Sequence, residues 1–255
     1  MVEIKTPADI GRMRRAGQVV ADILAAVRTA ADIGVTLRDL DGLARDVLAA
    51  SGARSSFLGY RPGFAPSPFP AVLCTSVNDA VLHGIPTGYR LRGGDLLSVD
   101  CGALLDGWAG DSATTFTVGT AGPIDTALID TGREALDAGI AAAVVGNRVG
   151  DISAAIGAIG RAAGYGINTD FGGHGIGRTM HELPSVPNEG TAGRGMRLVP
   201  GLVIAIEPWF MAGGDDRYRV GPDGWTLRSA DGSRAVHVEH TVAVTEDGPS
   251  ILTAA

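Results

Sequence analysis

Apolar residues recur at helical spacing through the first part of the chain. Thr6-Pro7 supplies a hydroxyl N-cap followed by proline at the first helical position, which is a helix-start signal. The apolar positions that follow it are Ile10, Met13, Val20, Ile23, Leu24 and Val27. A second helix is predicted to begin near Thr36 or Asp39 and to end at Gly52, because glycine is favoured just past a helix C-terminus. Its inward-facing residues are expected to be Leu40, Leu43 and Val47.

The same plan returns later in the chain. The segment ALDAGIAAAVVGNRVGDISAAIGAIGRAAG (135–164) again indicates helix, short turn, helix and glycine. At a constant offset of 112 residues, Gly34 falls on Gly146 and Gly52 falls on Gly164. The same offset superimposes Asp39 on Asp151, Leu40 on Ile152 and Val47 on Ile159. The agreement favours a duplicated α/β unit with pseudo-twofold symmetry, although two Ala-rich amphipathic hairpins can also agree by coincidence.

Strand-like runs of apolar and β-branched residues follow each helical pair. They cover 71–77, 95–105 and 108–118 in the first half, and 202–211 and 235–244 in the second. Between two of them, Asp106-Gly107 is a two-residue hairpin signal. Helices precede strands in each half, which is typical of an α+β fold and not of βαβ alternation. We therefore expect one domain over 1–255, built from halves of about 1–118 and 119–255.

Length and composition narrow this picture. With 255 residues, 45% of them hydrophobic, the chain can bury a large core as one domain or as two tightly joined halves. No apolar run approaches the ~18–20 residues of a membrane span, and the polar start lacks a signal-peptide core. The two cysteines, Cys74 and Cys101, form no CxxC, so a reducing cytoplasm is expected. A net charge of −7 with no basic block argues against nucleic acid as the main partner.

Four acidic residues interrupt strands that are otherwise apolar. With the hairpin turn placed as above, Asp100 and Asp111 lie on one face, offset by a single pleat. Glu207 and Glu239 each stand within a β-branched run. Exposed strand positions or a solvated sheet edge would explain each acid singly. No run of Lys or Arg is interleaved to pair them, and each unpaired buried ion costs several kcal/mol, so a metal cluster is the simplest compensation.

Glycines and histidines crowd the stretch FGGHGIGRTMHELP (171–184). Its glycines invite comparison with a dinucleotide-binding loop, but that motif needs a strand before it, a helix after it and an acid about 20 residues on. Here a proline follows ten residues after His174, and no Walker A motif is present. A lone histidine is more often a core or surface residue. Beside four unpaired acids, we favour His174 as a metal ligand around which glycines let the backbone pack closely.

Together these residues offer one nitrogen and four carboxylates, without a thiolate. The set is Asp100, Asp111, His174, Glu207 and Glu239. Structural zinc sites favour Cys and His, so this composition argues against one. It suits two divalent ions ~3.5–4 Å apart that share bridging carboxylates and a water. Four carboxylates balance two divalent charges, but the donors do not choose among Mn, Fe, Co and Zn.

Five motifs in this order resemble those of the type I methionine aminopeptidases, a family with the pita-bread fold. CTSVNDAVLHGIP (74–86) resembles the family's CxSxNxxxxHGIP, and LSVDCGALLDGWAGDSATTF (97–116) resembles its two-aspartate hairpin. GGHGIGRTMHELP (172–184), IEPW (206–209) and VEHTVAVTEDGPSILT (238–253) are similar to its remaining three motifs. The resemblance covers nearly the whole chain. It implies a single catalytic domain with an α+β pita-bread fold, in which pseudo-twofold helix pairs and antiparallel strands surround a central curved sheet.

The resemblance also implies roles for individual residues. The five acidic and histidine residues above match the family's dinuclear metal ligands. His83 matches a histidine near the N-terminal side of the substrate, and His181 matches one that hydrogen-bonds the scissile carbonyl or its oxyanion. The residues that resemble the methionine pocket are Tyr60, Phe69, Cys74 and Trp225, for which plain core packing is the alternative. His237 and His240 flank Glu239 without an implied role.

Two departures from the family concern the pocket. The stretch GYRPGFAPSPFP (59–70) is longer and richer in proline than the family's GYxGYP, and Met180 stands before His181 where an aromatic residue is common. Because of these two departures, the resemblance does not determine which residues form the rim of the pocket.

The implied activity is removal of the N-terminal methionine from nascent proteins and peptides, with a small second residue preferred. A hydroxide shared by two metals would attack the carbonyl, Glu207 would shuttle the proton, and His181 would stabilise the oxyanion. The implied setting is a cytoplasmic monomer that meets nascent chains, transiently near the ribosome exit, without a membrane or a specific nucleic acid as partner. The alternatives are an Xaa-Pro aminopeptidase of the same fold and a non-catalytic pita-bread binding protein.

Overall fold

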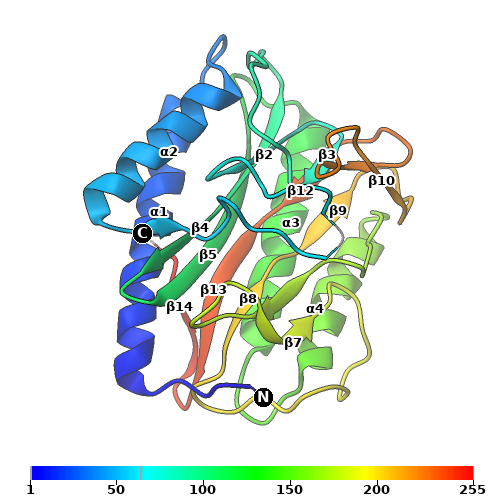
Figure 1. Ribbon diagram of the computed structural model, residues 1–255. Coiled ribbons are helices and arrows are strands. Elements are labelled where there is room, and N and C mark those ends of the chain that lie inside the picture. The colour runs from blue at the N-terminus through cyan, green and yellow to red at the C-terminus, as the bar shows by residue number, and fades with distance from the viewer. Residues whose placement is uncertain (1, 64, 255) are drawn as a thin grey trace.

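Two helix hairpins flank a strongly paired sheet in the computed structural model, which describes residues 2–63 and 65–254 (Figure 1). The helices are α1 (Pro7–Ala30), α2 (Leu37–Ser51), α3 (Pro123–Ala142) and α4 (Val149–Ala162). The strands of the first half are β1 (Arg54–Ser55), β2 (Cys74–Val77), β3 (Ala80–Leu82), β4 (Leu96–Leu105) and β5 (Trp108–Thr117). Those of the second half are β6 (Gly173–Gly175), β7 (Glu182–Val186), β8 (Val203–Ile206), β9 (Trp209–Met211), β10 (Tyr218–Val220), β11 (Leu227–Ser229), β12 (Ala235–His237), β13 (Glu239–Thr245) and β14 (Gly248–Ile251). Within these described ranges, no helix is both long and apolar enough to cross a bilayer.

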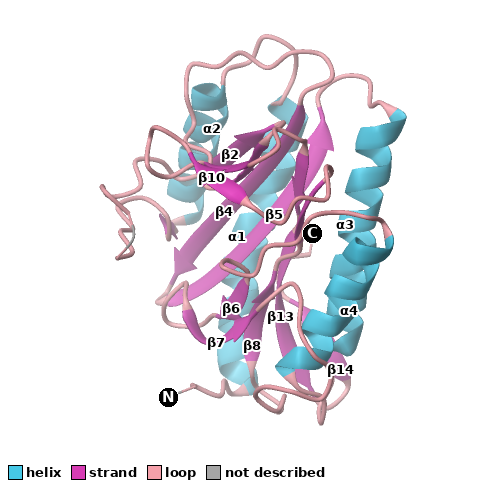
Figure 2. Cartoon of the chain, turned by 90° about the vertical axis from the view of Figure 1, so that its right-hand side faces the viewer, coloured by secondary structure: helices cyan, strands magenta, loops and turns pink. Residues whose placement is uncertain are grey.

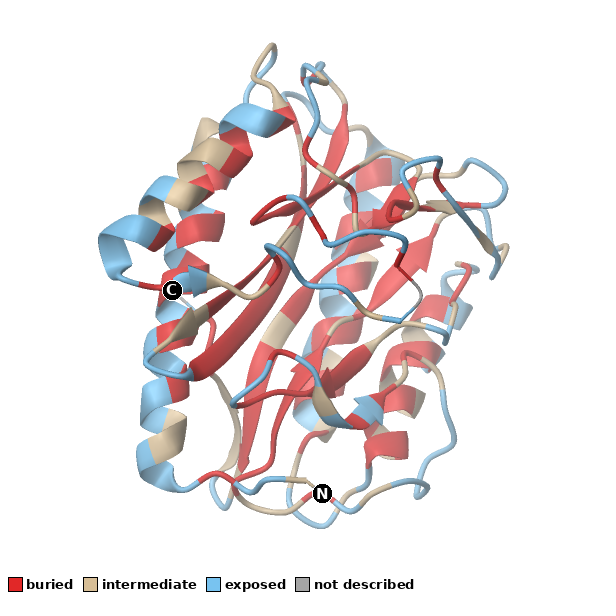
Figure 3. Cartoon of the chain, viewed as in Figure 1, coloured by how far each residue is buried: buried red, intermediate tan, exposed pale blue. Residues whose placement is uncertain are grey.

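One curled antiparallel sheet runs through the middle of the described chain. Its strands follow the order β1-β4-β5-β13-β8-β6-β7, with β2 added beside β4 and β14 beside β13. Helices α3 and α4 stand on one side of this sheet and loops cover the other (Figure 2). Buried residues concentrate in the strands and on the inner faces of the helices (Figure 3). One apolar cluster around Leu40 and Val99 lies under α1 and α2, and another around Ile152 and Ile204 lies under α3 and α4.

The starts of α1 and α2 are set by reciprocal caps. The Thr6 hydroxyl accepts the Asp9 N–H at 3.3 Å while the Asp9 carboxylate accepts the Thr6 N–H at 3.1 Å. Thr36 and Asp39 repeat this capping box at 3.1 and 2.9 Å. Both predicted helix starts are confirmed.

The buried stripe of α2 differs from the expected one. It consists of Leu37, Leu40, Asp41, Ala44 and Leu48. Leu43 and Val47, which were expected to face inward, are only half-buried. Because the helix begins at Leu37, the i, i+3 and i+4 positions counted from that residue face the core, and the expected stripe is correct only at Leu40.

The two helix hairpins share their turn chemistry. Gly34 and Gly146, which precede the second helix of each pair, have φ values of 90° and 96°. Gly52 and Gly164, which follow that helix, have φ values of 68° and 78°. Left-handed glycine at the same offset in both pairs supports a duplicated unit with pseudo-twofold symmetry. The division into halves at residues 118 and 119 stays a prediction.

The hairpin between β4 and β5 turns where the sequence predicted. Asp106 and Gly107 have φ values of 51° and 77°, both in the left-handed region, and Leu105 pairs with Trp108 across the turn. This register places Gly102 opposite Asp111.

Two runs that were expected to form single strands are each divided. The run 202–211 forms β8 and β9, which are separated by Glu207-Pro208, and the run 235–244 forms β12 and β13, which are separated by Val238. Proline has no N–H for a ladder, and the Val238 N–H instead donates to the Pro208 carbonyl at 3.1 Å. The two breaks face each other, so Glu207 lies at a bend rather than within a ladder.

The two halves of the sheet meet where β5 pairs with β13. The ladder there consists of two residue pairs, Ala113 with Glu239 and Ser112 with His240. Beyond the two ends of this ladder, threonine hydroxyls bind the backbone of the opposite strand. Thr241 Oγ1 donates to the Asp111 carbonyl at 2.7 Å and accepts the Asp111 N–H at 3.0 Å. Thr115 Oγ1 donates to the His237 carbonyl at 2.6 Å. We call this boundary between β5 and β13 the seam.

Replacing one seam hydroxyl should weaken the whole fold. Thr241→Val keeps the shape of a buried side chain but removes both bonds to the Asp111 backbone, so we expect a loss of about 1–3 kcal/mol in the free energy of unfolding. Urea denaturation followed by circular dichroism measures it. Thr29→Val, at an exposed helix position, is the matched control and should stay within about 0.5 kcal/mol of the parent. Equal effects of the two substitutions would show that the seam hydroxyls carry no stability.

Candidate metal centre and adjoining pocket

One row of residues crosses the sheet at the seam. The antiparallel register places Cys74 opposite Asp100, Asp100 opposite Ala113, and Ala113 opposite Glu239. Asp111 is two residues from Ala113 on the same strand, so its side chain lies on the same face. The middle member of the row is alanine, and its small side chain leaves space between the acids on either side.

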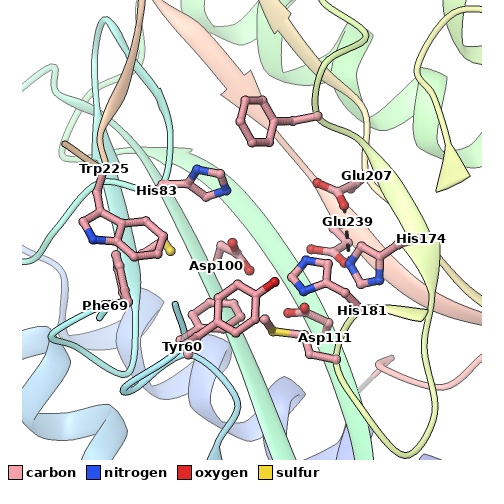
Figure 4. Close-up of a pocket in the computed structure, with 14 residues that line it drawn as sticks. Tyr60, Phe69, His83, Asp100, Asp111, His174, His181, Glu207, Trp225 and Glu239 are labelled. Atoms are coloured by element: carbon pink, nitrogen blue, oxygen red, sulfur yellow. Dashed lines mark ion pairs between the residues drawn. The ribbon is translucent and has the colours of Figure 1, made fainter. Parts of the chain in front are cut away.

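Two further side chains reach this space from the second half. Glu207 lies at the bend after β8, and His174 in β6 faces it, with Nε2 3.7 Å from Glu207 Oε1 (Figure 4). Asp111, His174 and Glu239 offer ligand atoms that lie within 4.8 Å of one another. The five residues predicted as ligands therefore surround one cavity.

Glycines hold the His174 backbone in a narrow space. A Cβ atom at Gly173 would lie 2.3 Å from the Ala205 carbonyl oxygen, and one at Gly175 would lie 2.1 Å from that of Leu183. His174 Nδ1 lies 2.9 Å from the Gly175 carbonyl oxygen. When Nδ1 carries the proton and donates it to this carbonyl, Nε2 faces the acids with a free lone pair, which is the form that binds a metal.

The acids of the cluster are not balanced by the protein itself. Asp100 Oδ1, Asp111 Oδ1 and Glu239 Oε1 are buried and have no hydrogen-bond partner among the described residues. Burial, followed by repulsion from the other carboxylates, raises the pKa of Asp100 and Glu239 well above the ordinary range. No lysine or arginine belongs to the described residues that line the cavity. Divalent cations would satisfy all three oxygens, so the residues fit a metal centre with carboxylate and imidazole donors.

His237, for which the sequence indicated no role, lies beside this cluster. Its Nε2 is 3.4 Å from Glu207 Oε2, and its side chain is 3% exposed. Thr115 binds both its backbone N–H and its carbonyl. A signal for it was present, because His237 and Glu239 are two residues apart in a β-branched run, a spacing that puts both on one strand face.

His83 and His181 line the same cavity from opposite sides. His83 has a φ of 57°, and its ring meets the Phe171 ring edge-on at 5.3 Å between centroids. Burial lowers the pKa of His83 to about 4. His181 stands at the rim, where its ring stacks on Tyr60 at 5.2 Å and lies 4.2 Å from the His174 ring. Desolvation, followed by the neighbouring His174, lowers the pKa of His181, so both rings are neutral at pH 7.

A cavity of about 110 Å³ adjoins the acids and has mainly aromatic walls. All four residues predicted for the pocket line it, namely Tyr60, Phe69, Cys74 and Trp225. Met180 lines it as well, together with Phe57 and Phe171, which no pattern in the sequence indicated because isolated phenylalanines form none. Trp225 Nε1–H donates to the Ser67 carbonyl at 3.1 Å, which holds the proline-rich loop against the cavity. The Phe69 ring packs edge-on against Trp225 at 5.0 Å.

Lys5 reaches from the N-terminal segment to the loop that carries His181. Its Nζ donates to Glu182 Oε2 at 2.7 Å, and the Lys5 side chain is only 1% exposed. The other oxygen of this carboxylate accepts the backbone N–H groups of Arg178 and Thr179 at 2.8 and 3.2 Å. This buried ion pair therefore anchors the loop between β6 and β7.

A carboxylate-rich metal centre at the seam of a duplicated unit is the arrangement of a metal-dependent peptidase with the pita-bread fold. The sequence matches the profile of metallopeptidase family M24 over residues 11–246, and the chain belongs to that family.

Within the family, the similarity is to methionine aminopeptidases. Methionine aminopeptidase 1 of Mycobacterium tuberculosis is 50% identical over 260 residues, which cover 99% of this chain and 95% of the relative. The crystal structure of a methionine aminopeptidase from Thermotoga maritima superimposes with a TM-score of 0.95 and 38% identity over the full length of both chains. The prolidase from Pyrococcus furiosus, at 23% identity and a TM-score of 0.79, shares the fold over 99% of this chain and 65% of its own. The chain thus stands among the methionine aminopeptidases, as its motifs indicated.

Removing one acid should separate charge repulsion from metal binding. Asp100→Asn takes away one of the mutually repelling carboxylates, so the Tm of the metal-free protein should rise by about 2–4 °C for each kcal/mol of repulsion relieved. The same change should abolish the Tm increase on adding Mn²⁺ or Co²⁺. Calorimetry with EDTA and with each metal measures both effects. Asp130→Asn, on the exposed face of α3, is the control and should change neither. A metal-dependent Tm increase that survives in Asp100→Asn would place the metal elsewhere.

Breaking the Lys5–Glu182 pair should loosen the loop that carries His181. Lys5→Met leaves the Glu182 carboxylate partly buried without its cation, and we expect a loss of about 2–4 kcal/mol in stability with faster amide exchange over 177–182. Lys5→Met combined with Glu182→Gln should recover part of the stability, because the unpaired charge is gone. If the double variant were less stable than Lys5→Met, the pair would not act as described.

Proposed function

We propose that this chain removes the N-terminal methionine from nascent proteins and peptides, using two divalent metal ions and preferring a small second residue. The observation that carries the proposal is a single cavity that is lined by carboxylates on one side and by aromatic side chains on the other. On one side of it lie buried carboxylate oxygens of Asp100, Asp111 and Glu239 that no described residue hydrogen-bonds, and on the other lie aromatic walls that include Phe69 and Trp225. Such a site can hold an apolar side chain while the adjacent peptide bond faces metals.

The donor set fits two divalent cations. The residues that would hold them are Asp100, Asp111, His174, Glu207 and Glu239, whose four carboxylates balance two divalent charges. When bound, such ions lower the pKa of a water and polarise a carbonyl. Carboxylate and imidazole donors are compatible with Co, Mn, Fe or Zn, so the identity of the metal is a matter for measurement.

The protein's own side chains would bind the substrate and move the proton. The aromatic cavity would receive the methionine side chain, whose flexible thioether suits an irregular apolar site. Glu207, flanked by imidazoles, is placed to take a proton from the attacking water and to pass it to the leaving amine. The neutral ring of His181, steadied by stacking on Tyr60, is placed to donate an N–H to the carbonyl oxygen. His83 would border the substrate on the opposite side.

The proposed setting is a cytoplasmic monomer that acts on nascent chains near the ribosome exit. The alternative of an Xaa-Pro aminopeptidase has less support, since the likeness to prolidase is one of fold and covers 65% of that protein. A non-catalytic binding protein has less support as well, because all five acidic and imidazole donors face the cavity.

Two histidine substitutions should have different effects. His174→Ala removes a proposed ligand and should lower both the bound metal and the release of methionine from Met-Gly-Met. His181→Ala removes a proposed oxyanion donor and should keep the metal while lowering kcat by about 10²–10³-fold. Metal content by mass spectrometry and methionine release by chromatography test both.

The controls address the alternatives. Faster cleavage of Ala-Pro peptides than of Met-Gly-Met would favour the Xaa-Pro activity. Absence of any cleavage by protein that binds the metals would favour the binding protein. Loss of metal from His181→Ala would show that the division of roles between the two histidines is wrong.

A further inference from the structure

A second cleft opens directly from the aromatic cavity. It has a volume of about 760 Å³ and shares Tyr60, Met180 and His181 with the smaller cavity. Since His181 would border the carbonyl that is cleaved, the cleft lies where the rest of a bound peptide would leave the site. This volume exceeds the room needed by the methionine side chain.

Three arginines give this cleft its charge. They are Arg45 in the middle of α2, Arg54 in β1 and Arg178 in the loop before β7. No aspartate or glutamate belongs to the described residues that line it, although the chain as a whole carries a net charge of −7. A basic cleft on an acidic protein is a local feature that would attract an anionic group. We call this cleft the arginine groove.

Two of the arginines have a carboxylate neighbour, which partly offsets their charge. Arg45 Nε donates to Asp41 at 2.7 Å, and the same carboxylate accepts two backbone N–H groups. Arg178 lies over the Trp108 ring at 3.6 Å and has Glu3 at 4.0 Å from its Nε. Arg54 is exposed and makes no ion pair or side-chain hydrogen bond with another described residue.

The floor between the arginines is apolar. Leu48, Val72, Leu104 and Leu58 line it, and Leu58 is 49% exposed. An extended peptide directs successive side chains to opposite sides, so apolar ones can cover such a floor while acidic ones reach the arginines. A nucleic-acid backbone has no counterpart for the apolar floor.

We propose that the arginine groove binds the part of the substrate that follows its second residue, and that it selects peptides with acidic downstream residues. The inference rests on the proposed aminopeptidase activity and specifies which peptides are its better substrates. Arg54 is the specificity-determining residue, because no described residue pairs with its charge.

The test uses metal-loaded protein and three peptides Met-Ala-Ala-Xaa-Xaa-Ala, in which Xaa is Glu, Gln or Lys. At low salt, kcat/KM for the Glu peptide should exceed that for the Lys peptide by about fivefold or more, and 0.5 M NaCl should bring the ratio toward one. Arg54→Gln should reduce the ratio by about two- to threefold, and Arg54→Glu should reduce it further. Arg133→Gln, which removes the same charge from an exposed position on α3, should leave the ratio unchanged.

The Gln peptide separates this inference from the proposed function. If metal-loaded protein does not cleave it, the aminopeptidase proposal fails. If the Gln peptide is cleaved equally by all variants but the ratio of Glu to Lys is near one, or does not depend on Arg54, the groove proposal is overturned. Inhibition by an RNA oligonucleotide that Arg54→Glu relieves, with a Glu to Lys ratio near one, would assign the groove to phosphates and would also overturn it.

Discussion

Buried negative charge at the seam is the constraint around which the rest of the structure is arranged. Asp100, Asp111 and Glu239 have carboxylate oxygens that no described residue hydrogen-bonds. Two unit charges 4 Å apart repel by about 4 kcal/mol even at an effective dielectric constant of 20. The protein therefore gathers acids that it cannot neutralise with its own side chains. Divalent cations between them would compensate this charge.

The two halves of the sheet each supply part of this charged cluster. The β4–β5 hairpin supplies Asp100 and Asp111, while the second half supplies the remaining acids and His174. A short ladder joins the halves, and hydroxyls of Thr115 and Thr241 bind the backbone where the ladder stops. The same bonds that join the halves thus hold the backbone of Asp111. Both the stability of the fold and the geometry of the site therefore depend on these contacts.

The sequence located the acids and His174 because ionisable residues in apolar strands conflict with the strand pattern, and such conflicts mark functional sites. The turn at Asp106-Gly107 was equally local, since two residues determine it. Pro208 was a local signal for the bend that carries Glu207, but the hydrogen bond from Val238 that sets this bend against the second break comes from a distant segment. The arginine groove left no local pattern either, because its charges come from segments far apart in the chain.

The Lys5–Glu182 pair and the seam also determine how late in folding the site can form. They join residues 177 and 130 positions apart, and contacts at such separations form late because closing long loops costs chain entropy. A chain under synthesis holds the two aspartates well before it holds Glu207 and Glu239. A chain made only as far as the two aspartates therefore has half of the candidate site, and the site can be assembled only after Glu239 has been added.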